Sequence, residues 1–283
     1  MKTRQQRGFT LIEMVVVIVI MGIVSASIAV FIRGSVKGYM DAARRAELTD
    51  IADTATRRIA RDLRLAVPNT TRVTQVGSVF YLEFLQAKTG GYYRADCITD
   101  TCSGEDILNF TATDSGFDVL GGFPASPAPQ AAVGDKIVIY NQGVTGADAY
   151  SNDNTGIISA LGGSVAVPRI TINPAIRFPS PSPNQSFQVI DSPVTYICDP
   201  GTAGSDGGGT LTRRWGYTMS AAQPTSFSGG SSALLATKLS GCKITPPESM
   251  PLAAYGLVAI FLKLKASDEE ITFYNEIHIS NVP

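Results

Sequence analysis

Histidine is almost missing from this chain of 283 residues, which contains only His278. A serine or cysteine nucleophile usually needs a neighbouring base, most often a histidine, and zinc sites commonly take histidine ligands. The chain also lacks the GxSxG, HExxH and GxxxxGK motifs of serine hydrolases, zinc proteases and phosphate-binding loops. These absences predict that the chain is not an enzyme and that it carries no cofactor.

Charge is scarce as well. Charged residues make up 17% of the chain, the net charge is −1, and the basic residues are spread out. Nucleic-acid binding requires a concentrated basic surface, so we expect no nucleic-acid partner. The segment Arg213-Arg214-Trp215 could stack on a single strand or a sugar, but a strand with one aromatic core residue explains it equally well.

The longest uncharged run extends from Met14 to Ile32 and follows the basic residues Lys2, Arg4 and Arg7. Its length meets the requirement of about 18 residues for a membrane-spanning helix. A basic head before such a run keeps the N-terminus in the cytoplasm, so the rest of the chain crosses to the outside. No convincing small-residue cleavage site follows the run, and we expect the anchor to stay attached.

One carboxylate, Glu13, lies inside the uncharged stretch from Gly8 to Ile32. A charged side chain at the centre of a membrane helix costs roughly 2.5 to 3.5 kcal/mol, so it normally has a partner and a function. A plain single-pass anchor or an uncleaved signal peptide has no use for Glu13. We therefore interpret it as a functional residue.

Cysteine is limited to Cys97, Cys102, Cys198 and Cys242, all on the outer side of the predicted membrane helix, where disulfides persist. Four cysteines allow three pairings. We favour Cys97 with Cys102 and Cys198 with Cys242, because each pair lies within its own stretch of chain. A zinc site is disfavoured because neither a CxxC motif nor a nearby histidine accompanies the four cysteines.

Helical periodicity continues beyond the anchor. Apolar residues recur at steps of three and four at Leu48, Ile51, Ala52, Ala55, Ile59, Leu63 and Ala66. Pro68 disfavours helical geometry in the residue before it, so the helix should end near Val67. Arginines between the apolar positions predict a solvated face, or a face that contacts neighbouring subunits.

After Pro68 the sequence pattern is typical of short strands separated by loops. Short runs rich in β-branched and aromatic residues predict strands at Val79–Leu85, Ile107–Ala112, Lys136–Tyr140, Val165–Ile172, Phe187–Ile190, Val194–Cys198 and Leu211–Met219. The last two runs, Leu257–Lys265 and Ile271–Ile279, predict an antiparallel hairpin with His278 on its solvated face.

The segment Gly8-Phe9-Thr10-Leu11-Ile12-Glu13, between a short basic leader and an apolar helix, resembles the class III signal of type IV pilins and type II secretion pseudopilins. The resemblance implies cleavage after Gly8 and N-methylation of Phe9 by a prepilin peptidase. It also implies that Glu13 meets the free N-terminal amine of a neighbouring subunit during filament assembly.

The implied fold is α+β: the type IV pilin fold, with a long N-terminal helix and a globular head rich in antiparallel β-sheet. The expected division is a leader peptide at 1–8, a transmembrane half-helix at 9–35, an amphipathic half at 36–67 and a β-rich head at 68–283. We expect a single-pass inner-membrane protein with a periplasmic head before assembly, and an extracellular position at the pilus tip afterwards.

Weaker motifs in the head resemble the large O-type minor pilins of the mannose-sensitive haemagglutinin (MSHA) pilus system, which are related to J-type pseudopilins. They are the segments 61–69, 90–94, 134–141 and 278–283. The implied partners are other minor pilins, the major pilin, the inner-membrane assembly platform and membrane lipid. A J-type pseudopilin of type II secretion is the first alternative, and a tip adhesin or nucleic-acid-uptake pilin is the second.

Two acidic clusters contain oxygen ligands that could hold calcium. One comprises Asp96, Asp100, Glu105 and Asp106, and the other, in a loop, comprises Asp148, Asn152, Asp153 and Asn154. Neither follows the EF-hand spacing, so the loop residues are only weak calcium candidates and solvation of a polar loop is favoured.

Overall fold

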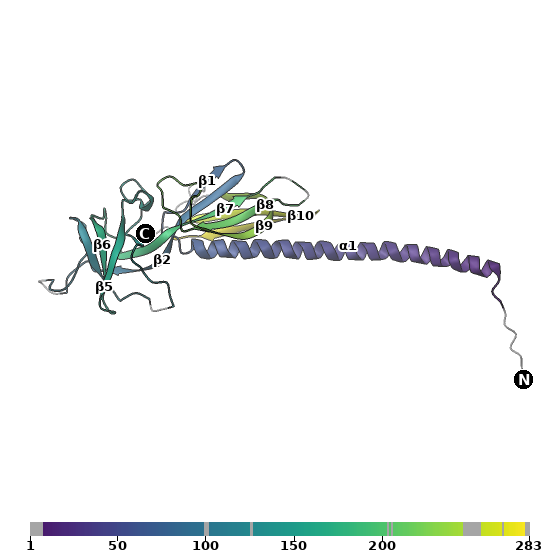
Figure 1. The fold of residues 1–283 in the computed structure, drawn as a ribbon, viewed down its shortest axis with the longest axis horizontal. Helices are drawn as coiled ribbons and strands as arrows, with labels where there is room; N and C mark the ends of the chain where they lie inside the picture. Colours follow the sequence, from purple (N-terminus) through teal and green to yellow (C-terminus); the bar gives the residue numbers. More distant parts are fainter. Residues whose placement is uncertain are drawn as a thin grey trace, which may run out of the picture. The chain divides into compact units, whose positions relative to one another are not determined.

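The computed structural model describes residues 8–98, 102–124, 127–202, 204, 206–245, 256–267 and 269–280. The chain separates into two compact units, one ending at Glu47 and the other, the head, beginning at Leu48. Helix α1 (Leu11–Leu63) contributes to both, and the sheet belongs to the head (Figure 1). One long N-terminal helix and a large antiparallel sheet make the fold α+β, as the sequence predicted.

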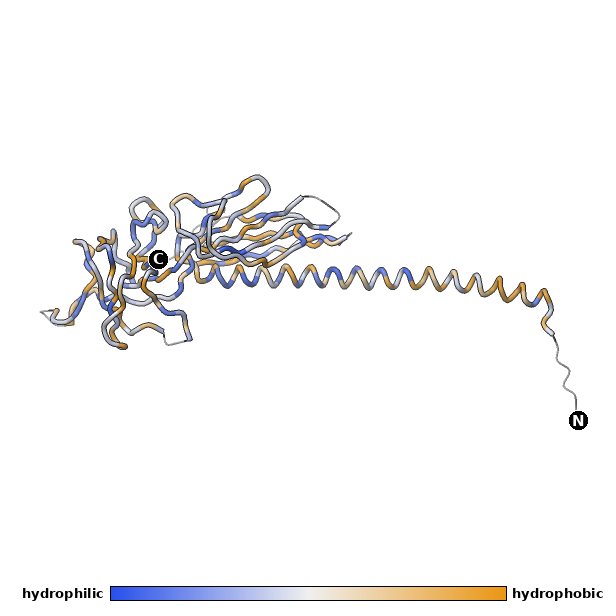
Figure 2. The backbone as a smooth tube through the Cα atoms, viewed as in Figure 1, coloured by the Kyte–Doolittle hydropathy of each residue, from blue (hydrophilic) through white to orange (hydrophobic). Residues whose placement is uncertain are grey.

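The first unit consists of the N-terminal part of α1 and the residues that lead into it. Every side chain from Gly8 to Met40 is exposed. The N-terminal turns of the helix are also the most hydrophobic (Figure 2). An apolar surface of this length without protein cover is expected of a helix whose solvent is lipid.

In the head, the last turns of α1 bury one face. The buried residues are Leu48, Ala52, Ala55, Thr56, Ile59, Asp62 and Leu63. This face confirms the predicted apolar stripe. The helix ends at Leu63, four residues before the expected boundary, because the amides of Leu65 and Ala66 turn back to the carbonyls of Asp62 and Leu63.

The described strands of the head form one antiparallel sheet. They are β1 (Arg72–Val76), β2 (Val79–Tyr93), β3 (Asp114–Leu120), β4 (Lys136–Val138), β5 (Thr155–Gly163), β6 (Pro168–Ile176), β7 (Ser186–Asp199), β8 (Gly209–Trp215), β9 (Ser231–Thr245), β10 (Leu257–Ala266) and β11 (Glu269–His278). Their order is β1-β2-β3-β6-β5-β4-β7-β8-β9-β10-β11, and β2 also pairs with β7. A 3-10 turn, η1 (Ala149–Ser151), precedes β5.

Two main hydrophobic cores share the long strands β2 and β7. The first places the buried face of α1 against β2 and β7 to β11, and it contains the stacked rings of Phe84 and Tyr196. The second lies among β2 to β7 and is built around Tyr93, Phe117 and Phe187. In Figure 1, β5 and β6 lie at the end of the head away from β8, β9 and β10.

Several strand predictions need correction. Ile107–Ala112 is not a strand, because the side chain of Asn109 accepts the amides of Thr111 and Ala112 and so bends the backbone. The runs 187–190 and 194–198 belong to one strand, β7. Strands β1, β3, β5 and β9 were not predicted, because serine, glycine and polar residues in or beside them have a low strand propensity.

The predicted hairpin is confirmed. Strand β10 pairs with β11 along its whole length, from Leu257 opposite His278 to Ala266 opposite Glu269. The odd-numbered side chains of β11 are more buried than the even-numbered ones, and His278 is exposed. His278 therefore lies on the solvated face, as the alternation predicted.

Candidate functional site

The N-terminal end of α1 is closed by a capping box formed by Thr10 and Glu13. The Glu13 amide donates to Thr10 Oγ1 at 3.4 Å, and the Thr10 amide donates to Glu13 Oε2 at 3.5 Å. The first amides of a helix have no hydrogen-bond partner within the helix. This reciprocal pairing gives two of them, those of Thr10 and Glu13, a side-chain acceptor. It holds the Glu13 carboxylate one turn from Phe9, whose side chain is 78% exposed, and from the predicted cleavage position after Gly8.

Residues that follow the capping box make α1 suitable for a membrane. By length and composition the helix qualifies as a membrane span, with a mean hydropathy of 3.0 in its most apolar window. The hydroxyl groups of Ser27 and Ser35 donate to the carbonyls of Ile23 and Phe31, at 2.9 and 3.2 Å. Because lipid offers no hydrogen-bond partner, satisfaction of these hydroxyls within the helix keeps the cost of embedding them low.

Asp62 fixes the last turn of α1 within the head. Its Oδ2 accepts the Arg213 Nε at 2.6 Å and the Tyr196 hydroxyl at 2.7 Å, and its Oδ1 faces the Arg58 Nε at 3.2 Å. Asp62 is 2% exposed. Burial raises the pKa of Tyr196, and Asp62 raises it further, so Tyr196 remains a hydrogen-bond donor.

The sequence reasoning missed this ion pair. The sequence does contain one indication of it. Asp62 lies on the apolar stripe of the helix between Ile59 and Leu63, where a buried acid would need a partner. Arg213 is 8% exposed and also donates to Gln86 at 3.0 Å, and its guanidinium lies 4.7 Å from the ring centre of Trp215. In the head, therefore, Arg213 is held by internal partners.

Both favoured cysteine pairs are present as disulfides. Cys97 is bonded to Cys102, and Cys198 in β7 is bonded to Cys242 in β9. The second bond links two strands that each border β8. The first closes a short loop whose acidic neighbours include part of the first predicted calcium cluster, although Asp100 lies outside the described residues.

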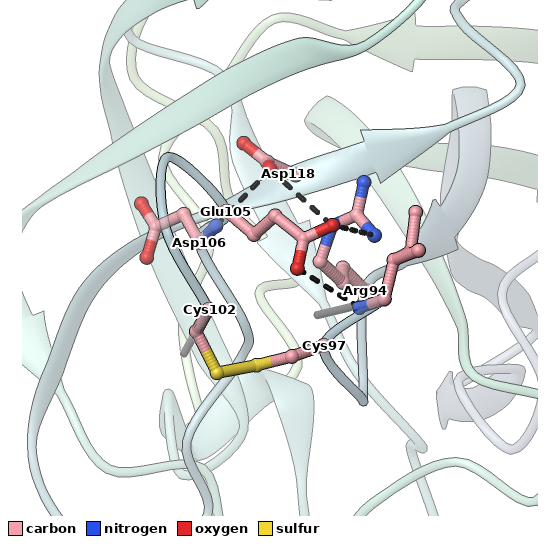
Figure 3. The surroundings of a disulfide bond; sticks show 7 residues. Arg94, Cys97, Cys102, Glu105, Asp106 and Asp118 are labelled. Atoms are coloured by element: carbon pink, nitrogen blue, oxygen red, sulfur yellow. Dashed lines mark hydrogen bonds and ion pairs between the residues drawn. A yellow bond between two sulfur atoms is a disulfide. The ribbon is translucent and has the colours of Figure 1, made fainter. Parts of the chain in front are cut away.

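Near the Cys97–Cys102 loop, Arg94 pairs with Glu105 and Asp118 (Figure 3). Arg94 lies 3.3 Å from both Glu105 and Asp118, and Arg169 Nε lies 2.8 Å from Asp118. Burial alone would raise the pKa of Asp118, but hydrogen bonds from Arg169, the Asp106 amide and Arg94 outweigh it and lower the pKa. Asp118 is thus held as an anion between two cations.

Acid should weaken the fold partly through Asp118. Because its folded pKa is depressed, its stabilising contribution is present above its ordinary value of 3.8 and is lost as the pH falls through the folded pKa. We expect Asp118→Asn to have a lower free energy of unfolding than wild type at neutral pH. The gap between the two free energies should become smaller below about pH 4. Urea unfolding between about pH 7 and pH 3 measures this.

The exposed Asp191, whose carboxylate accepts from Ser192 alone among the described residues, supplies the control for that series. Asp191→Asn should follow the wild-type pH profile. Parallel profiles for wild type and Asp118→Asn would contradict the assignment.

Three of the four weak calcium candidates have side-chain oxygens that accept hydrogen bonds from protein groups. Asp148 caps η1 through the Tyr150 amide, Asn152 Oδ1 accepts the Lys136 amine at 2.7 Å, and Asp153 Oδ2 accepts the Gly146 amide at 2.9 Å. Asn154 donates to the Ile139 carbonyl at 3.1 Å, while its buried Oδ1 accepts no hydrogen bond within the described part of the chain. Among the described residues, no group of three or more His, Cys, Asp or Glu side chains is placed to hold a metal ion.

Comparison with protein families identifies the prokaryotic N-terminal methylation motif at residues 3–29, which include Gly8, Phe9 and Glu13. This motif is a type IV pilin and pseudopilin signal and supports that general family. It points to a structural pilin rather than an enzyme, processed by a prepilin peptidase and assembled with other pilins. Comparisons with curated proteins and with solved structures found no significant match.

Proposed function

We propose that this chain is a minor pilin of a type IV pilus of the MSHA type. The observation that carries the proposal is the methylation motif at residues 3–29 together with the exposed side chains of α1 from Leu11 to Met40, which include its apolar N-terminal turns. A helix of this kind needs a membrane before assembly and the helices of neighbouring subunits afterwards. Prepilin peptidase would cut after Gly8 and methylate Phe9.

The size of the head supports a sparse or terminal position. The described head includes eleven strands and two main cores. A shaft in which every subunit carried a head of this size beside its helix would be crowded. We therefore place the protein in a filament-initiating or tip complex with smaller minor pilins. The four head motifs favour the O-type MSHA assignment over a J-type pseudopilin, the first alternative.

Crosslinking from the native membrane tests the proposal. A photo-reactive residue at Phe31, which is 76% exposed on the apolar helix, should capture minor pilins of the pilus system, and mass spectrometry should find mature chains that begin with N-methylated Phe9. The same probe in a Gly8→Asp chain, which should not be cleaved, is the matched control. Capture of secretion pseudopilins would support the alternative. Equal capture of pilins by cleaved and uncleaved chains would contradict the role of processing.

A further inference from the structure

Lys136 lies in β4, an interior strand of the sheet. Its strand, β4, has only three residues and lies between β5 and β7, where Lys136 is paired with Ile157 on one side and with Ile190 on the other. Directly paired residues place their side chains on the same face of a sheet. The Lys136 side chain therefore lies between two isoleucines and is half-buried.

The Lys136 amine has no anionic partner in the described part of the chain. Its hydrogen bond goes to the neutral Oδ1 of Asn152 at 2.7 Å. By contrast, Lys88 lies 2.8 Å from Asp135 and Lys263 lies 3.4 Å from Glu270. Burial lowers the pKa of Lys136, because the charged amine loses hydration on the half-buried face of the sheet.

A hollow of about 450 Å³ opens beside this amine. Lys136, Asn152 and Thr155 form its polar side, and Ile157, Pro174 and Ile176 are on its apolar side. Ile157 is 43% exposed, so part of its side chain remains open to a ligand. Among the described residues that line the hollow, Lys136 has the one ionisable side chain.

A second hollow, of about 420 Å³, lies on the other side of Lys136 and is lined in part by Asp191. An acid in the wall disfavours an anionic ligand there. The hollow beside Asn152 and Ile157 is therefore the better match for a negative group.

We propose that this hollow, hereafter the Lys136 pocket, binds a carboxylate carried by a compact aliphatic group. The carboxylate would accept a hydrogen bond from the Lys136 amine and supply the missing counter-charge, while the aliphatic group would cover Ile157 and Ile176. Such a ligand is either a free short-chain acid or the chain-terminal carboxylate of a polypeptide that ends in an aliphatic residue. The proposal does not depend on the role in pilus assembly.

Protection of Lys136 from acylation tests the proposal on the full chain in a non-ionic detergent. An amine-reactive ester is applied with pivalate, with N-acetylvaline as a mimic of a chain terminus, or with neutral pivalamide, and the rate at each lysine is read by peptide mass spectrometry. With a Kd of about 1 mM, about 20 mM of a carboxylate probe should slow acylation of Lys136 at least tenfold. Acylation of the exposed Lys243 should not change.

Protection by both carboxylates supports a site for free acids, and protection by N-acetylvaline alone supports a chain terminus. Absence of protection by either, or equal protection by pivalamide, would overturn the proposal. In a second measurement, saturation-transfer NMR with the protecting probe should lose its signal in Lys136→Gln and keep it in Lys243→Gln. Loss of the signal in both variants, or in neither, would also overturn it.

Discussion

Glu13→Gln should reduce the incorporation of this chain into filaments at least tenfold while cleavage after Gly8 continues. In the proposed role, the Glu13 carboxylate meets the amine created on Phe9 of a neighbour. Two opposite charges about 4 Å apart attract with about 4 kcal/mol at an effective dielectric constant near 20, which corresponds to a large change in assembly equilibrium. Quantitative detection of the chain in sheared filaments, against the membrane fraction, measures the effect.

The Glu13→Gln substitution removes the charge of Glu13 but keeps its role in the capping box. Its side-chain oxygen can still accept the Thr10 amide, so the capping box at the start of α1 is retained. Thr10→Ala is the matched variant, because it removes the cap and keeps the carboxylate. We expect Thr10→Ala to assemble far better than Glu13→Gln. If Glu13→Gln entered filaments normally, the charge-pairing account would be wrong; if Thr10→Ala failed equally, helix capping would explain the phenotype.

Asp62→Asn should lower the free energy of unfolding of the head by about 3 kcal/mol or more. Removal of one member of a buried ion pair leaves the other charge without compensation, which typically costs about 3 to 5 kcal/mol. Arg213, 8% exposed, would be that charge, and Tyr196 would lose its charged acceptor. Urea unfolding of the full chain in a non-ionic detergent, followed by tyrosine and tryptophan fluorescence, measures the difference.

The same helix provides the control for Asp62. Asp53 accepts from Arg57 at 2.7 Å, but the Arg57 side chain is 77% exposed. Water screens this pair, so Asp53→Asn should not change unfolding measurably. Equal effects of the two substitutions would show that Asp62 contributes only as a member of a surface pair.

The sequence was most informative where a pattern repeats or a motif is short and specific. The steps of three and four between Leu48 and Leu63 predicted the buried face of α1, and the alternation from Ile271 to Ile279 predicted the exposed and buried faces of the last hairpin. Both patterns arise from the geometry of a single element against one core. For that reason they can be read without knowledge of the partner element.

Contacts between distant segments could not be predicted in the same way. Asp62 and Arg213 are 151 positions apart, and only the packing of α1 on β8 brings them together. In the sequence Lys136 looks like an ordinary strand residue. Which groups surround its amine depends on the pairing of β4 with β5 and β7, and no acid among the described residues pairs with it. Strand β3 starts with Asp-Ser-Gly, a sequence typical of a turn. It is nevertheless a strand, and its Phe117 and Val119 side chains are buried in the second core.

The attachment of α1 to the head also has a mechanical consequence. In the proposed filament role, a pull along α1 would be transmitted to the head through the last turns of the helix. There the Asp62–Arg213 ion pair ties the helix to β8, and the Cys198–Cys242 bond ties β7 to β9 on either side of that strand. In that role, a load that enters at Asp62 would be shared by β7, β8 and β9 and would not separate one strand from the sheet.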